Sequence, residues 1–198
     1  MEKQDQSKKK KIGLLGGSFN PAHEGHLSIS LQALEILQLD EIWWLVANQN
    51  PLKPDDGMAS FDERLESAKN ISADYDKIIV SDIEKKNNIE YSYDTITDIR
   101  DDFPENKYIW LMGADNMTSF DKWYNWRGIL SLLPVAIIDR DGYKENALFS
   151  SFALEYIGRR VTLPTKLIDA KTPAWCFLEI DTHPQSSTNI RSQVNKNE

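Results

Sequence analysis

The feature that most constrains the fold is a regular alternation of short apolar runs with stretches of helical periodicity. The apolar runs have the length of buried strands and cover residues 12–15, 42–47, 78–80, 108–112, 135–138 and 175–180. Helical spacing occurs between them, at Leu27, Leu31 and Leu34 and around residues 95–100, 120–132 and 148–156. This alternation predicts an α/β fold in which helices cover both faces of a mostly parallel sheet.

In sheets of this kind ligands bind beyond the carboxyl ends of the strands, where the strand order reverses. The loops that follow strands are therefore the places to look for a site. One of them, residues 48–59, carries Pro51, Pro54 and Gly57 and is a candidate lid. Ser60 and Glu63 have the spacing of a capping box and predict that a helix begins directly after this loop.

Length and charge limit the function classes. The chain has 198 residues, 40% of them apolar, which predicts one domain over residues 11–198 behind a mobile polar tail at residues 1–10. The net charge of −8 disfavours a nucleic acid as the main partner. No segment has the pattern of a secretion signal or a membrane span, and the lone Cys176 lies in an apolar run, so we expect a cytoplasmic protein with Cys176 in its core.

The segment from Gly16 to His26 carries the first functional pattern. Its glycines let backbone N–H groups approach a phosphate, and the start of a helix adds partial positive charge. The segment lacks the lysine of a Walker A loop and the glycine spacing of a dinucleotide-binding fingerprint. His23 and His26, three residues apart, can share one helical face and donate to one phosphoryl group. The alternatives are two surface histidines and a metal site, although no cysteine or further histidine lies nearby.

This segment resembles the G-G-[ST]-F-[ND]-P-x-H-x-G-H signature of the HxGH nucleotidylyltransferase superfamily. The resemblance implies a Rossmann-like three-layer sandwich, the nucleotidylyltransferase fold. It also implies that His23 and His26 stabilise the phosphoryl group under attack and that Ser18 contacts phosphate.

The second pattern, from Ser186 to Arg191, offers three hydroxyls ahead of a guanidinium. These groups suit a phosphate tail, but an ordinary capped helix with a solvated arginine explains them equally well. The same superfamily carries a similar S-S-T-x-[IV]-R element near its end. By that resemblance Ser187, Thr188 and Arg191 hold the β- and γ-phosphates of ATP.

The third pattern begins with Gly113 and Asp115 at the end of an apolar run and continues with Trp123, Tyr124 and Trp126. A carboxylate at the end of a buried strand can accept from both ribose hydroxyls or cap a helix. The aromatic rings can stack on a base or fill the core. The spacing resembles that of the nicotinate and nicotinamide mononucleotide adenylyltransferases, where the aspartate contacts ribose and the tryptophan stacks on the pyridine ring.

Two shorter matches extend this resemblance over nearly the whole chain. Residues 50–53 lie where the bacterial enzymes have a Pro/Lys loop, and residues 91–95 resemble their Y-[TS]-x-D-T element, which places Ser92 at the pyridine pocket. The chain ends at Glu198, whereas many relatives continue into a longer terminal helix.

Taken by position, the resemblance implies a complete set of site residues. It assigns catalysis to His23, His26 and Arg191. It assigns ATP binding to Gly16, Gly17, Ser18, Phe19, Gly113, Asp115, Ser187, Thr188 and Ile190. It assigns binding of the second substrate to Asn20, Lys53, Ser92, Trp123 and Tyr124, and it names no metal ligand among the side chains.

The predicted reaction is transfer of the adenylyl group of ATP, with Mg2+, to nicotinate mononucleotide, which forms nicotinate adenine dinucleotide and pyrophosphate. The alternatives are nicotinamide mononucleotide or phosphopantetheine as acceptor, cytidylyl transfer, and a sensor that binds nucleotide without chemistry. A homo-oligomer is also possible, because Trp43, Trp44 and Trp126 would serve either as an interface or as core.

Overall fold

The computed structural model describes residues 9–48 and 57–181, together with Gln185, Ser187, Ile190 and Arg191. Most of the expected N-terminal tail and of the expected lid lie outside the described residues. So do two of the expected site residues, Lys53 and Thr188.

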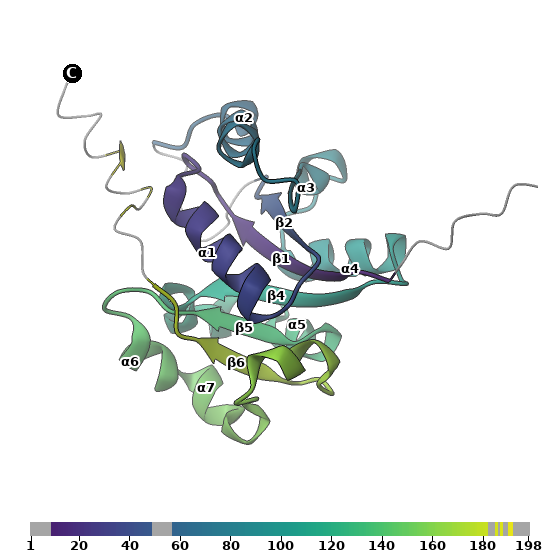
Figure 1. Cartoon of the computed structure of the whole chain (residues 1–198), viewed down its shortest axis with the longest axis vertical. Coiled ribbons are helices and arrows are strands. Elements are labelled where there is room, and N and C mark those ends of the chain that lie inside the picture. Colours follow the sequence, from purple (N-terminus) through teal and green to yellow (C-terminus); the bar gives the residue numbers. More distant parts are fainter. Residues whose placement is uncertain (1–8, 49–56, 182–184, 186, 188–189, 192–198) are drawn as a thin grey trace, which may run out of the picture.

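Six parallel strands form one sheet in the order β3-β2-β1-β4-β5-β6 (Figure 1). They are β1 (Lys11–Gly17), β2 (Glu41–Val46), β3 (Ile78–Ser81), β4 (Lys107–Gly113), β5 (Val135–Ile138) and β6 (Trp175–Leu178). Every apolar run that the sequence marks as a strand forms one, to within two residues at its ends. The strand order reverses between the neighbours β1 and β4, so a crevice is expected at their carboxyl ends.

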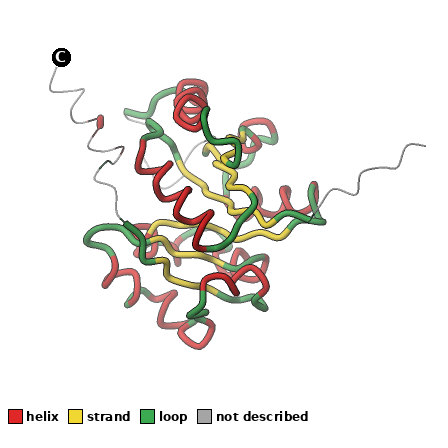
Figure 2. Tube along the Cα trace, viewed as in Figure 1, coloured by secondary structure: helices red, strands yellow, loops and turns green. Residues whose placement is uncertain are grey.

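Helices cover both faces of the sheet, which confirms the predicted three-layer α/β sandwich (Figure 2). Buried side chains of α1 (Glu24–Ile36), α2 (Phe61–Ser72) and the 3-10 helix η4 (Pro164–Asp169) pack on one face. The other face is covered by side chains from α4 (Ser92–Asp102), η1 (Ala114–Thr118), η2 (Phe120–Lys122), α5 (Trp126–Leu132), α6 (Lys144–Leu148) and α7 (Ser151–Glu155). The short α3 (Ile83–Lys86) follows β3, and the 3-10 turn η3 (Ile157–Arg159) follows α7.

Two stretches that the periodicity marks as single helices are interrupted. Within residues 120–132 the chain forms η2, passes through Asn125 in the left-handed region at φ 47°, and only then enters α5. Within residues 148–156 the first helix ends at Leu148, and Ser150 begins α7 by accepting a hydrogen bond from the backbone N–H of Ala153 at 3.3 Å. Hydrophobic spacing alone carries no information on such local breaks.

Two of the three tryptophans that the sequence left open between core and interface belong to the core. Trp44 and Trp126 are buried, and Trp43 is partly buried and packs on Phe103 and Tyr108, so the first two are core residues. Cys176 is also buried, as predicted, and burial raises the pKa of its thiol to about 12 because the thiolate is poorly solvated there. Among the described residues, no helix is both long enough and apolar enough to cross a membrane.

Candidate active site

The loop between β1 and α1 ends in a reciprocal pair of histidines. His23 is the N-cap of α1, and its Nδ1 accepts from the backbone N–H of Gly25 at 3.1 Å. His26 returns the contact, because its Nδ1 accepts from the backbone N–H of His23 at 3.3 Å. The two rings lie 3.9 Å apart between centroids. This is a capping box built from imidazoles, and it brings both predicted histidines to the helix N-terminus.

The hydrogen bonds fix the tautomer of both rings. A neutral imidazole whose Nδ1 accepts must carry its proton on Nε2, so each ring donates from its Nε2–H. Burial lowers the pKa of His26 to about 3, with smaller contributions from electrostatic repulsion by the His23 imidazole and the Arg140 guanidinium against a charged His26. His26 is therefore a neutral donor across the physiological pH range.

Packing against aromatic rings fixes the position of His26. Phe19 lies 4.8 Å from the His26 ring and stacks on Trp44 at 5.1 Å. The indole N–H of Trp44 donates to the Ser30 hydroxyl at 2.8 Å, and that hydroxyl donates to the carbonyl of His26 at 2.7 Å. Phe19 adopts φ 47°, so the loop turns sharply to place this ring.

The C-terminal segment lies on the same loop. Arg191 donates from Nη1 to the carbonyl of Asn20 at 2.6 Å, and Ser187 donates to the carbonyl of Pro21 at 3.0 Å. A β-carbon at Gly25 would lie 2.8 Å from the His23 ring and 3.0 Å from the carbonyl oxygen of Gln185. Glycine is therefore required where α1, the histidines and the chain end meet. The first and second sequence patterns, 160 or more residues apart, form one site.

Asp115 stands at the end of β4, across the switch point from this loop. Its Oδ2 accepts from Nη1 of Arg140 at 2.7 Å, whereas its Oδ1 is buried without a hydrogen-bond partner among the described residues. The Ser18 hydroxyl in the β1–α1 loop is likewise buried and unpaired within the part of the chain that is described. Buried polar atoms without partners are rare in folded proteins, and binding sites are one place where they occur.

The side chain of Asn20 makes two hydrogen bonds within the protein. Its Nδ2 donates to the carbonyl of Gly57 at 3.1 Å, and its Oδ1 accepts from the backbone N–H of Ala59 at 3.1 Å. Asn20 therefore joins the β1–α1 loop to the chain ahead of α2.

Sequence reasoning misses three charged residues around the site. Arg140 follows β5 and pairs with Asp115. Arg64, on α2, donates to carbonyls of the β1–α1 loop and of the chain after β2. Glu84, on α3, accepts a hydrogen bond from a backbone N–H of the chain after β2. Only Arg64 carried a signal, because an arginine between Phe61 and Ala68 interrupts the apolar face of the predicted helix.

An aromatic group lies where α4 begins. Tyr124 is 54% exposed and its ring lies 4.6 Å from that of Tyr91, the N-cap of α4. Trp123 packs edge-on against the buried Phe120 at 5.4 Å. Ser92 is the first residue of α4, and the N-cap supplies no side-chain hydrogen bond to the helix. Of the expected residues for the second substrate, Ser92 and Tyr124 therefore lie together at the N-terminus of α4, and Trp123 is adjacent to Tyr124 in the chain.

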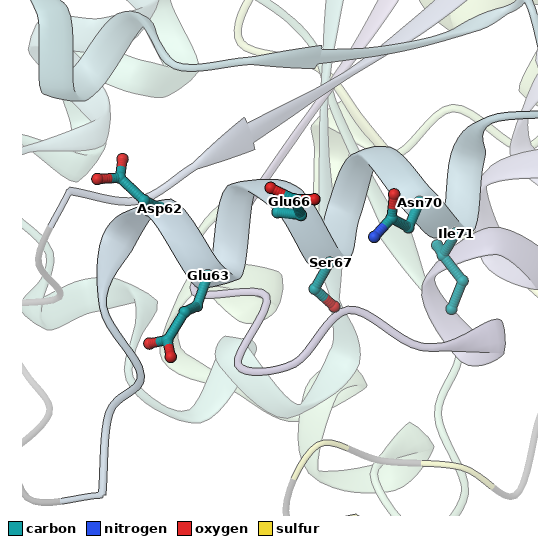
Figure 3. A pocket seen from close by; sticks show the side chains of 6 residues that line it. All are labelled: Asp62, Glu63, Glu66, Ser67, Asn70 and Ile71. Atoms are coloured by element: carbon teal, nitrogen blue, oxygen red, sulfur yellow. The ribbon is translucent and has the colours of Figure 1, made fainter.

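A separate hollow along α2 contains none of these groups (Figure 3). It is lined by Asp62, Glu63, Glu66, Ser67, Asn70 and Ile71. The three carboxylates make this surface unsuitable for a polyphosphate.

Comparison with known proteins agrees with the sequence patterns. The model of the cytidylyltransferase-like family matches residues 14–193. A protein of Parvibaculum lavamentivorans named a probable nicotinate-nucleotide adenylyltransferase is 44% identical, with 92% of each chain covered. One of the same name from a Ruegeria species is 42% identical, with 92% of this chain and 96% of that protein covered.

A solved structure has the same fold. It is the Plasmodium falciparum nicotinic acid mononucleotide adenylyltransferase in complex with NaAD, with a TM-score of 0.70, 18% identity, and coverage of 92% of this chain and 83% of that chain. The family model and the bacterial relatives show that the chain belongs to the cytidylyltransferase-like family, and these relatives are named nicotinate-nucleotide adenylyltransferases.

Proposed function

We propose that this protein transfers the adenylyl group of ATP to nicotinate mononucleotide, forming nicotinate adenine dinucleotide and pyrophosphate. The observation that carries the proposal is the histidine capping box, which places two imidazoles at the N-terminus of α1, in the loop that follows β1 at the switch point of the sheet. The two bacterial relatives are named for this activity, and this chain matches them over nearly their whole length.

The reaction needs placement and charge rather than a base. A phosphate oxygen of the mononucleotide attacks the α-phosphorus of ATP, and the bond to the β-phosphate oxygen breaks, releasing pyrophosphate. The attacking phosphate is already ionised, so proton removal contributes little. His23 and His26 donate to the α-phosphoryl oxygens as their charge develops, and Arg191 holds the leaving pyrophosphate. For Ser187 to join it, its hydroxyl must turn away from the carbonyl of Pro21.

Two unpaired atoms fit the rest of ATP. The buried Oδ1 of Asp115 accepts from a ribose hydroxyl, while Arg140 holds the other carboxylate oxygen in place. The buried Ser18 hydroxyl donates to a phosphate oxygen beside the backbone of Gly16 and Gly17. A nucleotide would thereby satisfy groups that the described part of the protein leaves without partners.

The aromatic group at the start of α4 suits the pyridine mononucleotide. Trp123 or Tyr124 offers a ring face for stacking. The leading N–H groups of α4 receive no side-chain cap, and a helix N-terminus favours an anion. A ring carboxylate at Ser92 would gain more from this partial charge than a neutral ring carboxamide, which favours nicotinate, whereas Asp94 in the first turn of α4 opposes this preference.

We expect Mg2+ to bind together with ATP. In the described part of the chain no three His, Cys, Asp or Glu side chains gather as a metal site. The ion would be held mainly by the phosphates of ATP, because substrate phosphates are common ligands of Mg2+. Its contribution is to shield the negative charge of the triphosphate. A cytoplasmic location and the absence of a nucleic-acid partner remain predictions from the sequence.

The test is pyrophosphate release from ATP and Mg2+ with nicotinate mononucleotide, nicotinamide mononucleotide or phosphopantetheine offered separately. We expect release with nicotinate mononucleotide at the highest kcat/KM, and loss of release when EDTA removes the metal. Release with phosphopantetheine alone would keep the superfamily and discard the substrate. ATP binding without release from any acceptor would favour the sensor.

A further inference from the structure

A buried guanidinium joins three segments of chain beside the proposed phosphate site. Arg64, on α2, is only 2% exposed. Its Nη1 donates to the carbonyls of Ser18 at 2.7 Å and Ala47 at 2.8 Å. Its Nη2 donates to the carbonyl of Asn48 at 3.1 Å, and its Nε to that of Ala59 at 3.2 Å. One side chain therefore connects the β1–α1 loop, the chain after β2 and the start of α2.

Burying this charge is costly. Desolvation lowers the pKa of Arg64, although the charge of Glu84 partly opposes this effect. Apolar residues of similar volume often stabilise a fold as well as a buried charge does. A stabilising role alone is thus a weak explanation for a guanidinium here, whereas four carbonyl acceptors in fixed positions are what its planar set of donors can hold.

Glu84 binds the same segment after β2 through the backbone N–H of Asn48. It is 5% exposed, accepts from the backbone N–H of Asn48 at 3.2 Å, and accepts from the Thr95 hydroxyl at 3.0 Å. Its burial raises the pKa of its carboxyl to about 7. Asn48 is therefore held at its carbonyl by Arg64 and at its N–H by Glu84, which fixes the chain at the end of β2.

The same loop carries the proposed reactive groups. Ser18, whose carbonyl Arg64 binds, contributes the unpaired hydroxyl. The next residue, Phe19, packs on His26, and the carbonyl of Asn20 accepts from Arg191. A shift of the Ser18 peptide would therefore move the proposed phosphate contacts together.

We propose that Arg64 is a positioning residue for adenylyl transfer. It holds the Ser18 peptide against the end of β2 and thereby sets where the Ser18 hydroxyl and the histidine pair meet the phosphates of ATP. This inference rests on the proposed function. A lysine cannot replace the guanidinium, because one ammonium nitrogen cannot reach carbonyls that Nε, Nη1 and Nη2 bind separately.

The experiment compares Arg64→Lys with a matched control, Arg127→Lys. Arg127 lies on the surface of α5 and pairs with Glu155 of α7. Both helices pack on the face of the sheet opposite to α1. Folding is checked by circular dichroism and thermal unfolding, and kcat and both KM values come from pyrophosphate release. We expect a folded Arg64→Lys with kcat lowered about tenfold or more, because small displacements of reacting groups cost up to about a hundredfold. The KM for ATP should rise while that for the mononucleotide stays unchanged.

The selective rise in the KM for ATP separates positioning from stability. Loss of folded protein lowers the apparent kcat and leaves both KM values unchanged. Wild-type kinetics in Arg64→Lys, or a loss confined to Tm and apparent kcat, would overturn the inference. If Arg64→Lys does not fold, Glu84→Gln replaces it, since it removes the opposing charge with little change of shape. The same selective rise in KM then supports the inference, and its absence overturns it.

A failure of the proposed function would look different. In that case the wild type itself releases no pyrophosphate with any acceptor. The rise in Tm on adding ATP then becomes the readout. A rise in the wild type and in Arg127→Lys that is lost in Arg64→Lys supports the positioning role, and an equal rise in all three, or none in any, overturns it.

Discussion

Replacing His26 by asparagine would separate the two tasks of this side chain. The Oδ1 of asparagine lies at the same number of bonds from the backbone as the Nδ1 of histidine, so it can still accept from the N–H of His23. The Nε2–H donor is lost. The variant therefore keeps the capping box and loses the proposed contact to phosphate.

The two losses differ in size. Without the ring, the contacts of His26 with Phe19 and Trp44 disappear, which costs about 1–2 kcal/mol of unfolding free energy. Removing one preorganised donor to a developing charge costs about 3 kcal/mol of transition-state stabilisation, roughly a hundredfold in kcat. A domain with about 5 kcal/mol of stability stays almost entirely folded after the first loss. Unfolding therefore cannot account for the fall in kcat.

The comparison variant is His26→Gln, whose amide nitrogen can reach toward the position of Nε2 but leaves the His23 N–H without its acceptor. We expect the glutamine variant to keep more kcat and less stability than the asparagine variant. Turnover is measured by pyrophosphate release and stability by urea unfolding. Wild-type turnover in His26→Asn would refute the role assigned to the Nε2–H.

Three further outcomes are expected. Gly25→Ala places a methyl group 2.8 Å from the His23 ring and should lower kcat by roughly a hundredfold in a folded protein, as measured by steady-state kinetics. Asp115→Asn should raise the KM for ATP by about tenfold, and Arg140→Gln by less, in the same assay; equal KM values in all three proteins would contradict the ribose assignment. Burial raises the pKa of Glu84 to about 7, above its unfolded value. Its contribution to the free energy of unfolding is thus complete below about pH 4.5 and is lost as the pH rises through 7. Urea unfolding at a series of pH values should show this decrease in the wild type and a smaller decrease in Glu84→Gln.

The fold was predictable because its determinants are local or periodic. Six apolar runs became six strands, since strands buried on both faces need continuous apolar sequence. The capping box of Ser60 and Glu63 begins α2 as its spacing predicts. The breaks at Asn125 and Ser150 were not predictable, because they depend on single backbone conformations that the surrounding apolar pattern does not encode.

From residue spacing alone, without the family resemblance, the candidate site could be predicted only where its residues lie close together in the sequence. His23 and His26 are three residues apart, and their spacing alone suggests a shared helical face. Arg64 lies on α2, Glu84 on α3 and Arg140 in the loop after β5, and they reach the site only because the parallel strands bring these segments to one edge of the sheet. Nothing in their sequence neighbourhoods shows which carbonyl or carboxylate they contact.

The structural and chemical roles of the histidines are coupled through one ring. A serine or aspartate at position 23 would cap α1 as well as imidazole does. Imidazole differs in carrying a second nitrogen on the far side of the ring, so the hydrogen bond that caps the helix also fixes where the Nε2–H points. A donor held in this way need not reorganise when charge develops on the phosphoryl oxygens, which is the condition for strong electrostatic catalysis. The helix start therefore preorganises the donors on which the proposed chemistry depends.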